Sequence, residues 1–237
     1  MRSHPHEVRL SPPPKSRTTK VAHLPAGRPP RGVADARRQE REDELLRAAA
    51  VVLARRGIRS TSMDALAEDL GIPKSVLYRY FSTREALLAA ILGGFAAQMR
   101  ALQSRPWRGL GRNLREVLLL ARANRSEFLL ITRHCPADPE YRCYFEELHT
   151  SIVERTDVLL KESSHSLAAD ATLRQLSSHA TAGFLIDAVL WWVEQGDAAR
   201  DDDFVAWTRR AMDTMYAGWQ ARPEMRPTRA PTDASGA

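Results

Sequence analysis

The chain has 237 residues, of which 43% are apolar and 27% charged, an ordinary globular composition that excludes wholesale disorder. Its two cysteines, Cys135 and Cys143, are too few for a disulfide framework, so we expect a reducing, cytoplasmic location. Residues 1–30 lack the apolar segment of a secretory signal, and no run of 18 apolar residues predicts a membrane-spanning helix.

The excess of basic residues lies in the amino-terminal part of the chain. Residues 1–95 contain 17 Lys and Arg against 10 Asp and Glu, a net charge of +7, whereas residues 96–237 have a net charge of −1. A positive field confined to one part of a protein favours a polyanionic partner, most simply nucleic acid. A basic unstructured tail beside a neutral domain would produce the same charge distribution, so both interpretations stay open at this point.

Both ends of the chain are rich in proline, and the region between them has helical periodicity. Residues 1–36 contain seven prolines and two acidic residues, and we expect them to form a disordered basic arm. Residues 222–237 are expected to be a disordered tail. No alternating stretch predicts a strand, so the expected fold is all-α. The expected helices cover about 36–56, 62–70, 74–80, 83–103, 108–123, 126–133, 138–163, 168–195 and 201–220.

The most informative stretch is residues 61–81, where two short predicted helices flank a glycine. Four residues give the first helix one apolar face: Met63, Leu66, Ala67 and Leu70. Gly71 permits the left-handed turn that reverses the chain. Thr61 and Asp64 have the spacing of a capping box, with Ser62 as the alternative cap. Two short helices joined by a tight glycine turn are a helix-turn-helix, which presents the start of its second helix to the DNA major groove.

Five motifs follow one another in and around this stretch. They are Ala54-Arg-Arg-Gly57, Thr61-Ser62-Met63-Asp64-x-Leu66-Ala67, Gly71-Ile72, Leu77-Tyr78-x-Tyr80-Phe81 and Arg84-Glu85-x-Leu87-Leu88. Over about residues 37–95 the chain thereby resembles the amino-terminal domain of the tetracycline-repressor (TetR) family of transcription regulators. Two positions depart from the family pattern, which usually has Ser where Pro73 stands and Lys where Arg84 stands. Neither departure threatens the fold, because Pro is tolerated in a first helical turn and Arg keeps the charge.

The resemblance implies a division of the chain into functional parts. A three-helix helix-turn-helix DNA-binding domain over 37–83 would be followed by a larger helical domain for ligand binding and dimerisation over 84–221. The arm at 1–36 and the tail at 222–237 lie outside both domains. The implied function is a ligand-responsive transcription regulator, most simply a repressor, that binds double-stranded DNA.

Nine residues are expected to contact DNA: Thr61, Ser62, Lys74, Ser75, Val76, Tyr78, Arg79, Tyr80 and Arg84. At a helix start, the Ser62 hydroxyl and the free backbone N–H groups can hold a phosphate. Lys74, Ser75 and Val76 begin the recognition helix and should face base edges, although Lys74 can also reach a phosphate. Arg84, at the start of the next helix, is expected to point toward a phosphate.

Three of these nine residues, Tyr78, Arg79 and Tyr80, lie further along the recognition helix. The resemblance implies phosphate contacts by Tyr78 and Tyr80. Tyr80 can equally be a core residue with only its hydroxyl exposed, and Arg79 can be a solvated helix residue rather than a DNA contact.

The last two long helices, expected at 168–195 and 201–220, are those that form the homodimer in the family. They carry four tryptophans: Trp191, Trp192, Trp207 and Trp219. This is more aromatic surface than a solvated helix pair should expose, although packing in the monomer core is the alternative. A homodimer suits a palindromic operator, because a twofold DNA site needs a twofold protein.

An effector pocket is expected within the larger domain. Its candidate apolar lining is Phe95, Met99, Leu118, Phe128, Tyr141, Phe145, Phe184 and Trp191, and its candidate polar groups are His134, His149 and Asp187. Each of these residues can instead belong to the ordinary core, and Asp187 can face solvent at a helix bend. The expected effector is a mostly apolar small molecule that loosens DNA binding by changing the separation of the recognition helices.

No cofactor, metal site or enzymatic activity is expected. The spacings of His134, Cys135, Cys143 and His149 match no common zinc pattern, and no nucleophile–base motif or phosphate-binding glycine motif occurs. No membrane partner is expected either. The alternative to a sequence-specific regulator is a nucleoid-type protein that binds DNA without sequence preference, and footprinting separates the two.

Overall fold

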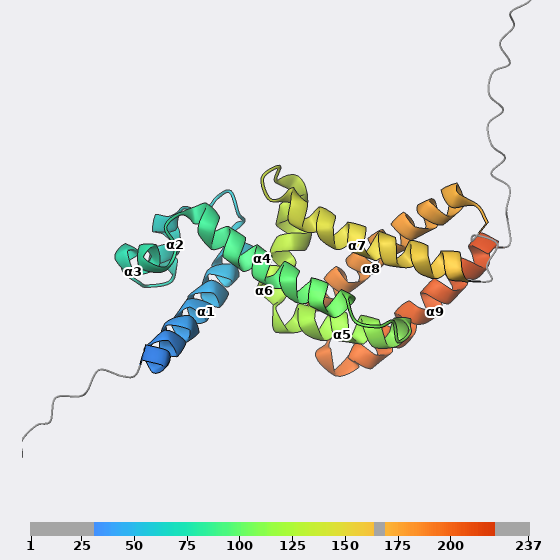
Figure 1. Cartoon of the computed structure of the whole chain (residues 1–237), viewed down its shortest axis with the longest axis horizontal. Helices are drawn as coiled ribbons and strands as arrows, with labels where there is room; N and C mark the ends of the chain where they lie inside the picture. Colours follow the sequence, from blue (N-terminus) through green and yellow to red (C-terminus); the bar gives the residue numbers. More distant parts are fainter. Residues whose placement is uncertain (1–30, 164–168, 221–237) are drawn as a thin grey trace, which may run out of the picture. The chain divides into compact units, whose positions relative to one another are not determined.

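The computed structural model describes residues 31–163 and 169–220, with side chains over 35–163 and 169–219, and all regular secondary structure in these ranges is helical (Figure 1). The elements are α1 (Arg31–Arg56), α2 (Met63–Asp69), α3 (Lys74–Tyr80), α4 (Arg84–Gln103), α5 (Leu110–Ala123), α6 (Arg125–Leu129), η1 (Leu130–His134), η2 (Cys135–Ala137), α7 (Arg142–Glu162), α8 (Ala171–Gln195), η4 (Ala198–Arg200) and α9 (Asp201–Gln220). The predicted all-α class is confirmed.

Helix α1 begins at Arg31, earlier than the predicted start near residue 36. Residues 31–36 therefore belong to a helix and not to the basic arm. The physical reason is that no proline occurs between Arg31 and Arg56, so nothing stops the helix from extending back toward the prolines that precede it. The rest of the expected arm, 1–30, and the expected tail, 222–237, lie outside the described residues.

The chain divides into two units, residues 1–38 and residues 39–237. Of the first, the structure describes the opening turns of α1. The second has one continuous hydrophobic core, which includes Leu53 of α1, Leu77 of α3, Leu92 of α4, Leu118 of α5 and Ile186 of α8. Because Leu77 is fully buried, the short helix α3 is anchored to this core by its own middle residue.

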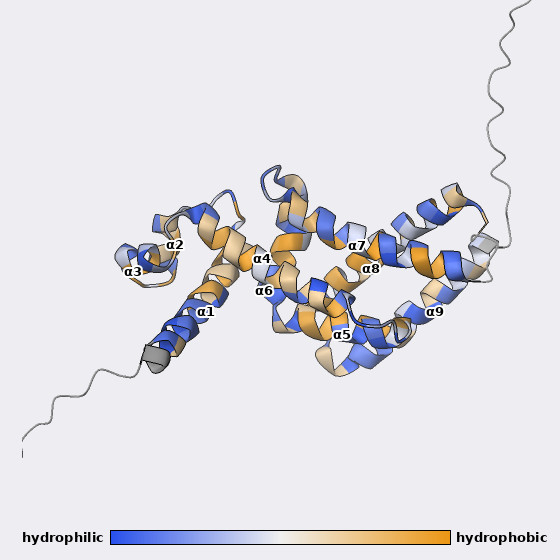
Figure 2. Cartoon of the chain, in the orientation of Figure 1, coloured by the Kyte–Doolittle hydropathy of each residue, from blue (hydrophilic) through white to orange (hydrophobic). Residues whose placement is uncertain are grey.

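Helix α4 is the most uniformly apolar of the early helices (Figure 2). By length and composition alone it could cross a membrane. Leu88, Leu92 and Phe95 are nevertheless at most 1% exposed, so packing inside this protein accounts for much of its apolar character. Thr83 caps the helix by accepting a hydrogen bond from the backbone N–H of Ala86 at 3.1 Å.

The region between α5 and α7 is less regular than the sequence predicts. The helix expected over 126–133 is the short α6, which continues as the π-helix η1, where the Thr132 hydroxyl donates to the Phe128 carbonyl at 2.7 Å. The helix expected from residue 138 begins at Arg142. The preceding residues form a turn in which the Asp138 carboxylate accepts from the backbone N–H of Glu140 at 3.1 Å. Helices α7 and α8 then lie side by side (Figure 1).

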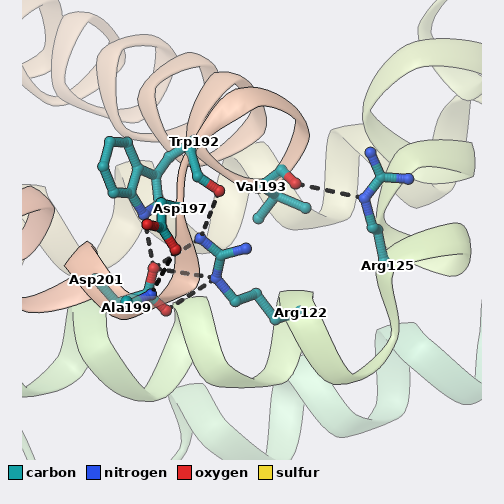
Figure 3. Close-up of polar contacts among 8 residues, drawn as sticks. Arg122, Arg125, Trp192, Val193, Asp197, Ala199 and Asp201 are labelled. Carbon is teal, nitrogen blue, oxygen red and sulfur yellow. Dashed lines mark hydrogen bonds and ion pairs between the residues drawn. The ribbon is translucent and has the colours of Figure 1, made fainter.

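The connection between α8 and α9 is tied to α5 by one arginine (Figure 3). The Arg122 guanidinium donates to both carboxylate oxygens of Asp201, at 2.7 and 2.8 Å, and Nη2 also donates to the Gly196 carbonyl at 3.3 Å. The Trp192 indole N–H donates to the same Asp201 carboxylate at 2.7 Å. A Cβ atom at Gly196 would lie 2.6 Å from the Trp192 carbonyl oxygen, so only glycine fits there.

Candidate DNA-binding surface and effector cavity

Helix α2 starts at a side-chain cap that also marks the edge of the candidate DNA-binding surface. The Ser62 hydroxyl oxygen accepts from the backbone N–H of Ala65 at 3.1 Å, so the cap is Ser62, the predicted alternative, and not Thr61. Ser62 is exposed, and its hydroxyl hydrogen is available to donate to a phosphate oxygen.

The turn between α2 and α3 depends on Gly71. This residue has φ +63°, and its backbone N–H donates to the Glu68 carbonyl at 3.0 Å, while the N–H of Ile72 donates to the Ala67 carbonyl at 3.0 Å. A Cβ atom at Gly71 would meet nothing within 4 Å, so the turn needs glycine for its backbone conformation and not for space. Pro73, with φ −60°, then leads directly into α3.

Helix α3 has one buried and one exposed face. Leu77 is fully buried, and Phe81 at the helix end is 4% exposed. Lys74, Ser75 and Tyr78 are exposed, and because they lie at helical positions one, two and five they share a face turned away from Leu77. The Tyr78 side chain is 47% exposed, which is unusual for an aromatic residue. This face therefore presents a cation, a hydroxyl and a phenol to solvent.

Two expected DNA contacts on α3 already have partners within the protein. The Lys74 ammonium forms an ion pair with Asp64 on α2, in which both side chains are largely exposed. The Arg79 guanidinium lies 5.4 Å from the centre of the Tyr80 ring. Tyr80 is half-buried and packs against the core, which favours the interpretation that only part of this side chain faces outward. Val76 is also half-buried.

Thr61 and Arg84 need a correction, because the structure gives both a structural role. Thr61 is 2% exposed, and its hydroxyl donates to the Gly57 carbonyl at 3.0 Å. The Arg84 guanidinium donates through Nε to the Thr61 carbonyl at 3.0 Å and through Nη2 to the Ile58 carbonyl. Both side chains therefore hold the loop between α1 and α2 against the start of α4. The positive φ of Gly57, +92°, explains why this loop can turn back on itself.

Replacing Arg84 by glutamine should lower the free energy of unfolding by about 1.5–3 kcal/mol, because two carbonyls lose a charged hydrogen-bond donor. The Arg84 side chain is 24% exposed, which favours the lower part of that range. Urea denaturation followed by circular dichroism measures the effect. Arg79→Gln, which removes an exposed arginine from the neighbouring helix, serves as the control and should change stability little. Equal stability of Arg84→Gln and the original chain would contradict the structural role.

The loop after α1 also contacts the turn before α7. The Arg59 guanidinium donates through Nε to the Asp138 carboxylate at 3.0 Å. One ring nitrogen of His134, in η1, lies 3.2 Å from the Ala54 carbonyl oxygen at the end of α1. These contacts join the helix-turn-helix region to the segment around η1. Helix η1 follows directly on α6, which contains Phe128 and Leu129.

The Asp138 contact should make stability depend on pH. The hydrogen bond from Arg59 lowers the pKa of the Asp138 carboxyl below its ordinary value, and the backbone N–H of Glu140 acts in the same direction. A lowered pKa in the folded state means that the stabilisation is present above the unfolded pKa, about 3.9, and is lost as pH falls through the folded pKa. Urea midpoints between pH 6 and pH 3 should fall more steeply for the original chain than for Asp138→Asn. Identical slopes would show that this carboxylate does not contribute.

The larger helical region encloses a cavity of about 310 Å³. This volume lies at the lower end of the range for small-molecule sites. Of the predicted pocket residues, Met99 and Phe128 line it. Most of the lining was not predicted and comes from four helices: Leu114 and Val117 of α5, Leu148, Ile152 and Leu159 of α7, Leu185, Ile186 and Val189 of α8, and Met212 and Tyr216 of α9.

The remaining predicted pocket residues do not line this cavity. Phe95, Leu118 and Tyr141 are buried in the core, and Phe145 packs against it. His134 contacts the Ala54 carbonyl, and the His149 ring lies 5.4 Å from that of His179. Phe184, Asp187 and Trp191 lie on the outer surface of α8. Helical spacing in the sequence could mark these residues as candidates for the interior. It could not predict which interior helix face lines the cavity.

An open aromatic groove lies on α8 and α9. We call it the α8–α9 groove, and it is lined by Phe184, Asp187, Ala188, Trp191, Trp192, Arg200, Asp203, Phe204, Ala206, Trp207 and Arg210. Trp191 is 60% exposed and Trp207 is 52% exposed, which is rare for tryptophan on a monomer surface. Trp192 is held by Asp201 and stacks on Phe204 with ring centres 4.9 Å apart.

Within residues 31–163 and 169–220, no group of three His, Cys, Asp or Glu side chains is arranged to hold a metal ion. Cys135 is fully buried, and burial raises the pKa of its thiol to about 12, so it is not a thiolate near neutral pH. Cys143 is exposed.

Helices α2 and α3 are joined by a tight glycine turn, and α3 exposes a polar face. Within an all-helical chain, this arrangement defines a helix-turn-helix DNA-binding protein. Residues 45–91 match the family model described as bacterial regulatory proteins, tetR family. The match places a DNA-binding region of the TetR type at residues 45–91.

The individual relatives differ in how much of the chain they match. The HTH-type transcriptional activator FasR of Mycolicibacterium smegmatis is 42% identical over 55 residues, which is 23% of this chain and about a quarter of that protein. A TerR/AcrR-family regulator from Aquifex aeolicus has TM-score 0.58 at 14% identity, covering 73% of this chain and 98% of its own. A TetR-like regulator from Rhodococcus sp. RHA1 has TM-score 0.55 at 24% identity, covering 78% and 99%. At these identities the structural likeness concerns the fold.

Proposed function

We propose that this protein is a cytoplasmic, homodimeric repressor that binds a palindromic operator and is released by a mostly apolar small molecule. In this proposal residues 37–83 bind DNA and residues 84–221 bind the effector and form the dimer. It acts by binding and has no enzymatic activity. The observation that carries the proposal is the exposed face of α3, where Lys74, Ser75 and Tyr78 face solvent while Leu77 anchors the helix.

The chemistry of this face suits a DNA major groove. Lys74 can donate to guanine O6 and N7, and Ser75 can hydrogen-bond to either a base edge or a phosphate. Tyr78 has a hydroxyl that can donate to a phosphate oxygen, and Ser62 at the start of α2 can do the same. Val76 and Tyr80 are half-buried, so we expect them to contribute less than the three exposed residues. Arg79 remains a candidate phosphate contact because it is exposed.

The Lys74–Asp64 ion pair bears on how DNA is bound. In the free protein the ammonium group of Lys74 faces a carboxylate, and binding to a base edge or phosphate must replace this contact. The Asp64 carboxylate itself would repel nearby phosphates. DNA affinity is therefore expected to owe more to Ser75, Tyr78 and Arg79 than the sequence by itself indicated.

The α8–α9 groove supports the dimeric part of the proposal. Two exposed tryptophans and Phe184 gather on one face, and charged residues of both signs, Asp203 and Arg210, rim it. An apolar centre with a mixed-charge rim is typical of a protein interface. A second copy of this chain would bury the tryptophans and place two α3 helices in a twofold arrangement that matches a palindrome.

Sequencing of genomic fragments retained by the purified protein, followed by footprinting of the enriched sites, tests the proposal. We expect discrete protected palindromes, with half-sites about one helical turn apart. Uniform protection without sequence preference would instead indicate a nucleoid-type protein. Because the relative FasR is named an activator, the repressor assignment needs its own readout. A reporter under the identified operator should be expressed more strongly when the chain is deleted, and weaker expression would identify an activator.

Replacing Tyr78 by alanine should weaken binding to all operator sequences about equally, by roughly tenfold, because a backbone contact to a charged group is lost. Tyr78→Phe isolates the hydroxyl and should lose most of the same affinity. Electrophoretic mobility shifts with a set of operator variants measure both. A loss confined to one base position would show that Tyr78 reads sequence and not the phosphate backbone.

A further inference from the structure

The wall of the 310 Å³ cavity has one charged side chain among the described residues that line it. This residue is Arg155 of α7, and the rest of the lining is aliphatic, aromatic or neutral polar. A lone charge beside an apolar volume is unfavourable unless something compensates it.

No carboxylate within residues 31–163 and 169–220 forms an ion pair with Arg155. Asp157, two residues further along α7, is paired with Arg174, whose Nε donates to it at 2.8 Å. The Arg155 guanidinium instead lies 6.0 Å from the centre of the Trp107 ring. A cation over an aromatic face is stabilised by about 0.5–1 kcal/mol at exposed sites, less than a charged hydrogen bond supplies.

Four neutral polar side chains of the wall form internal hydrogen bonds. The Ser151 hydroxyl donates to the Leu148 carbonyl at 2.7 Å. The Thr181 hydroxyl lies 2.7 Å from the Ser177 carbonyl and 2.9 Å from the Tyr216 hydroxyl. Ser163 is likewise bonded to the Leu160 carbonyl, at 2.6 Å. Arg155 carries the one positive charge among the described lining residues, and a charged donor binds an anion more strongly than a neutral donor does.

The position of Arg155 indicates where a charged group would sit. Arg155 is partly exposed, and Trp107, which lies between α4 and α5, is 39% exposed, so this part of the wall reaches solvent. Fully buried residues such as Met212 and nearly buried ones such as Ile186 line other parts of the same cavity. A ligand with its charge at Arg155 can therefore keep that charge near water and place its apolar part against the aliphatic wall.

We infer that the effector is an anionic amphiphile. Its one acidic head group, such as a carboxylate, binds Arg155, and its unbranched or compact apolar body fills the cavity. This inference rests on the proposed function, since it names the ligand class of the same cavity. It excludes cationic effectors, because the positive charge of Arg155 would repel an amine. It also refines the earlier expectation of a merely apolar effector.

Three probes with the same chain length test the charge requirement: decanoate, decanol and decylamine. A cavity of about 310 Å³ holds on the order of ten heavy atoms, at the roughly 30 Å³ that one water molecule occupies in the liquid, so ten-carbon probes match its size. Isothermal titration calorimetry with the full chain and no DNA should show decanoate binding at least about tenfold more tightly than decanol, with decylamine weakest. Equal affinities for decanoate and decanol, tighter binding of decylamine, or no binding of any probe would overturn the inference.

Variants of α7 assign the effect to one side chain. Arg155→Gln should lower decanoate affinity by about 10- to 100-fold and leave decanol affinity unchanged, which also shows that the cavity is intact. Arg155→Lys, which keeps the charge, should retain much of the decanoate affinity. Lys161→Gln removes an exposed positive charge from the same helix outside the cavity and should change neither affinity. Unchanged decanoate binding by Arg155→Gln would show that the guanidinium merely extends into solvent.

Failure of this inference is distinguishable from failure of the proposed function. Calorimetry without DNA tests the ligand class, whereas operator binding tests the regulator. If the protein protects a palindrome but prefers decanol or decylamine, only the ligand class is wrong. If decanoate binds through Arg155 but no operator is found, the proposed function fails and the anion site stands.

Discussion

Replacing Trp207 by glutamate should convert the proposed dimer to a monomer and lower operator affinity by about 100-fold or more. Trp207 lies in the α8–α9 groove, 52% exposed in one chain, with its ring 6.2 Å from that of Phe184. Central aromatic residues commonly supply most of the free energy of an interface, and a glutamate there would be a buried charge without a partner. Each subunit would then bind one half-site alone and lose the gain that comes from linking two sites.

Leu119→Glu is the matched control for this variant. Leu119, on α5, is 57% exposed, as accessible as Trp207, and it lies outside the groove. Sedimentation equilibrium and mobility shifts with one palindromic operator should show Leu119→Glu to be dimeric and fully active in binding. If Trp207→Glu stayed dimeric with unchanged affinity, the subunit interface would lie on another surface, although α3 could still bind DNA.

Replacing Asp201 by alanine should lower the free energy of unfolding by about 3 kcal/mol and the melting temperature by roughly 6–12 °C. The Asp201 carboxylate accepts hydrogen bonds from Nε and Nη2 of Arg122 and from the Trp192 indole, and the ion pair is largely buried, with side chains 21% and 15% exposed. Its removal leaves the guanidinium and the indole N–H without their acceptor. Differential scanning calorimetry measures the loss.

Asp202→Ala provides the comparison, because the neighbouring carboxylate has a different environment. Asp202 pairs with Arg115 while remaining 71% exposed, and exposed ion pairs contribute at most about 1 kcal/mol. We expect its melting temperature to change by no more than a few degrees. A similar loss in both variants would mean that the acidic start of α9 acts through the helix dipole and not through the Arg122 contact.

The Asp201 variant should also weaken dimerisation. Trp192 lines the α8–α9 groove and stacks on Phe204, and Asp201 fixes its indole from behind. A small stability loss accompanied by a large dimerisation loss would therefore locate the main effect at the groove.

The helix-turn-helix could be predicted from sequence because its signals are local. Gly71 and the apolar residues of α2 act within a few residues of one another, and α3 runs over Lys74–Tyr80, the range that the sequence predicts. The starts of α4 and α9 likewise lie within one residue of prediction, since a Thr83 cap and an acidic first turn mark them locally. Helical spacing also predicted that residues such as Leu118 and Phe95 turn inward.

Positions whose environment depends on distant segments could not be assigned in this way. Thr61 and Arg84 stand where DNA contacts would be expected, but 23 residues separate them and their bond to each other exists only after the loop folds back. The sequence by itself determined the all-helical class, the helix-turn-helix and the family, because period, cap and turn chemistry act over short stretches. The tertiary structure alone decided which apolar faces enclose an empty volume, which tryptophans stay exposed and which arginine lines that volume, because each depends on how helices far apart in sequence pack together.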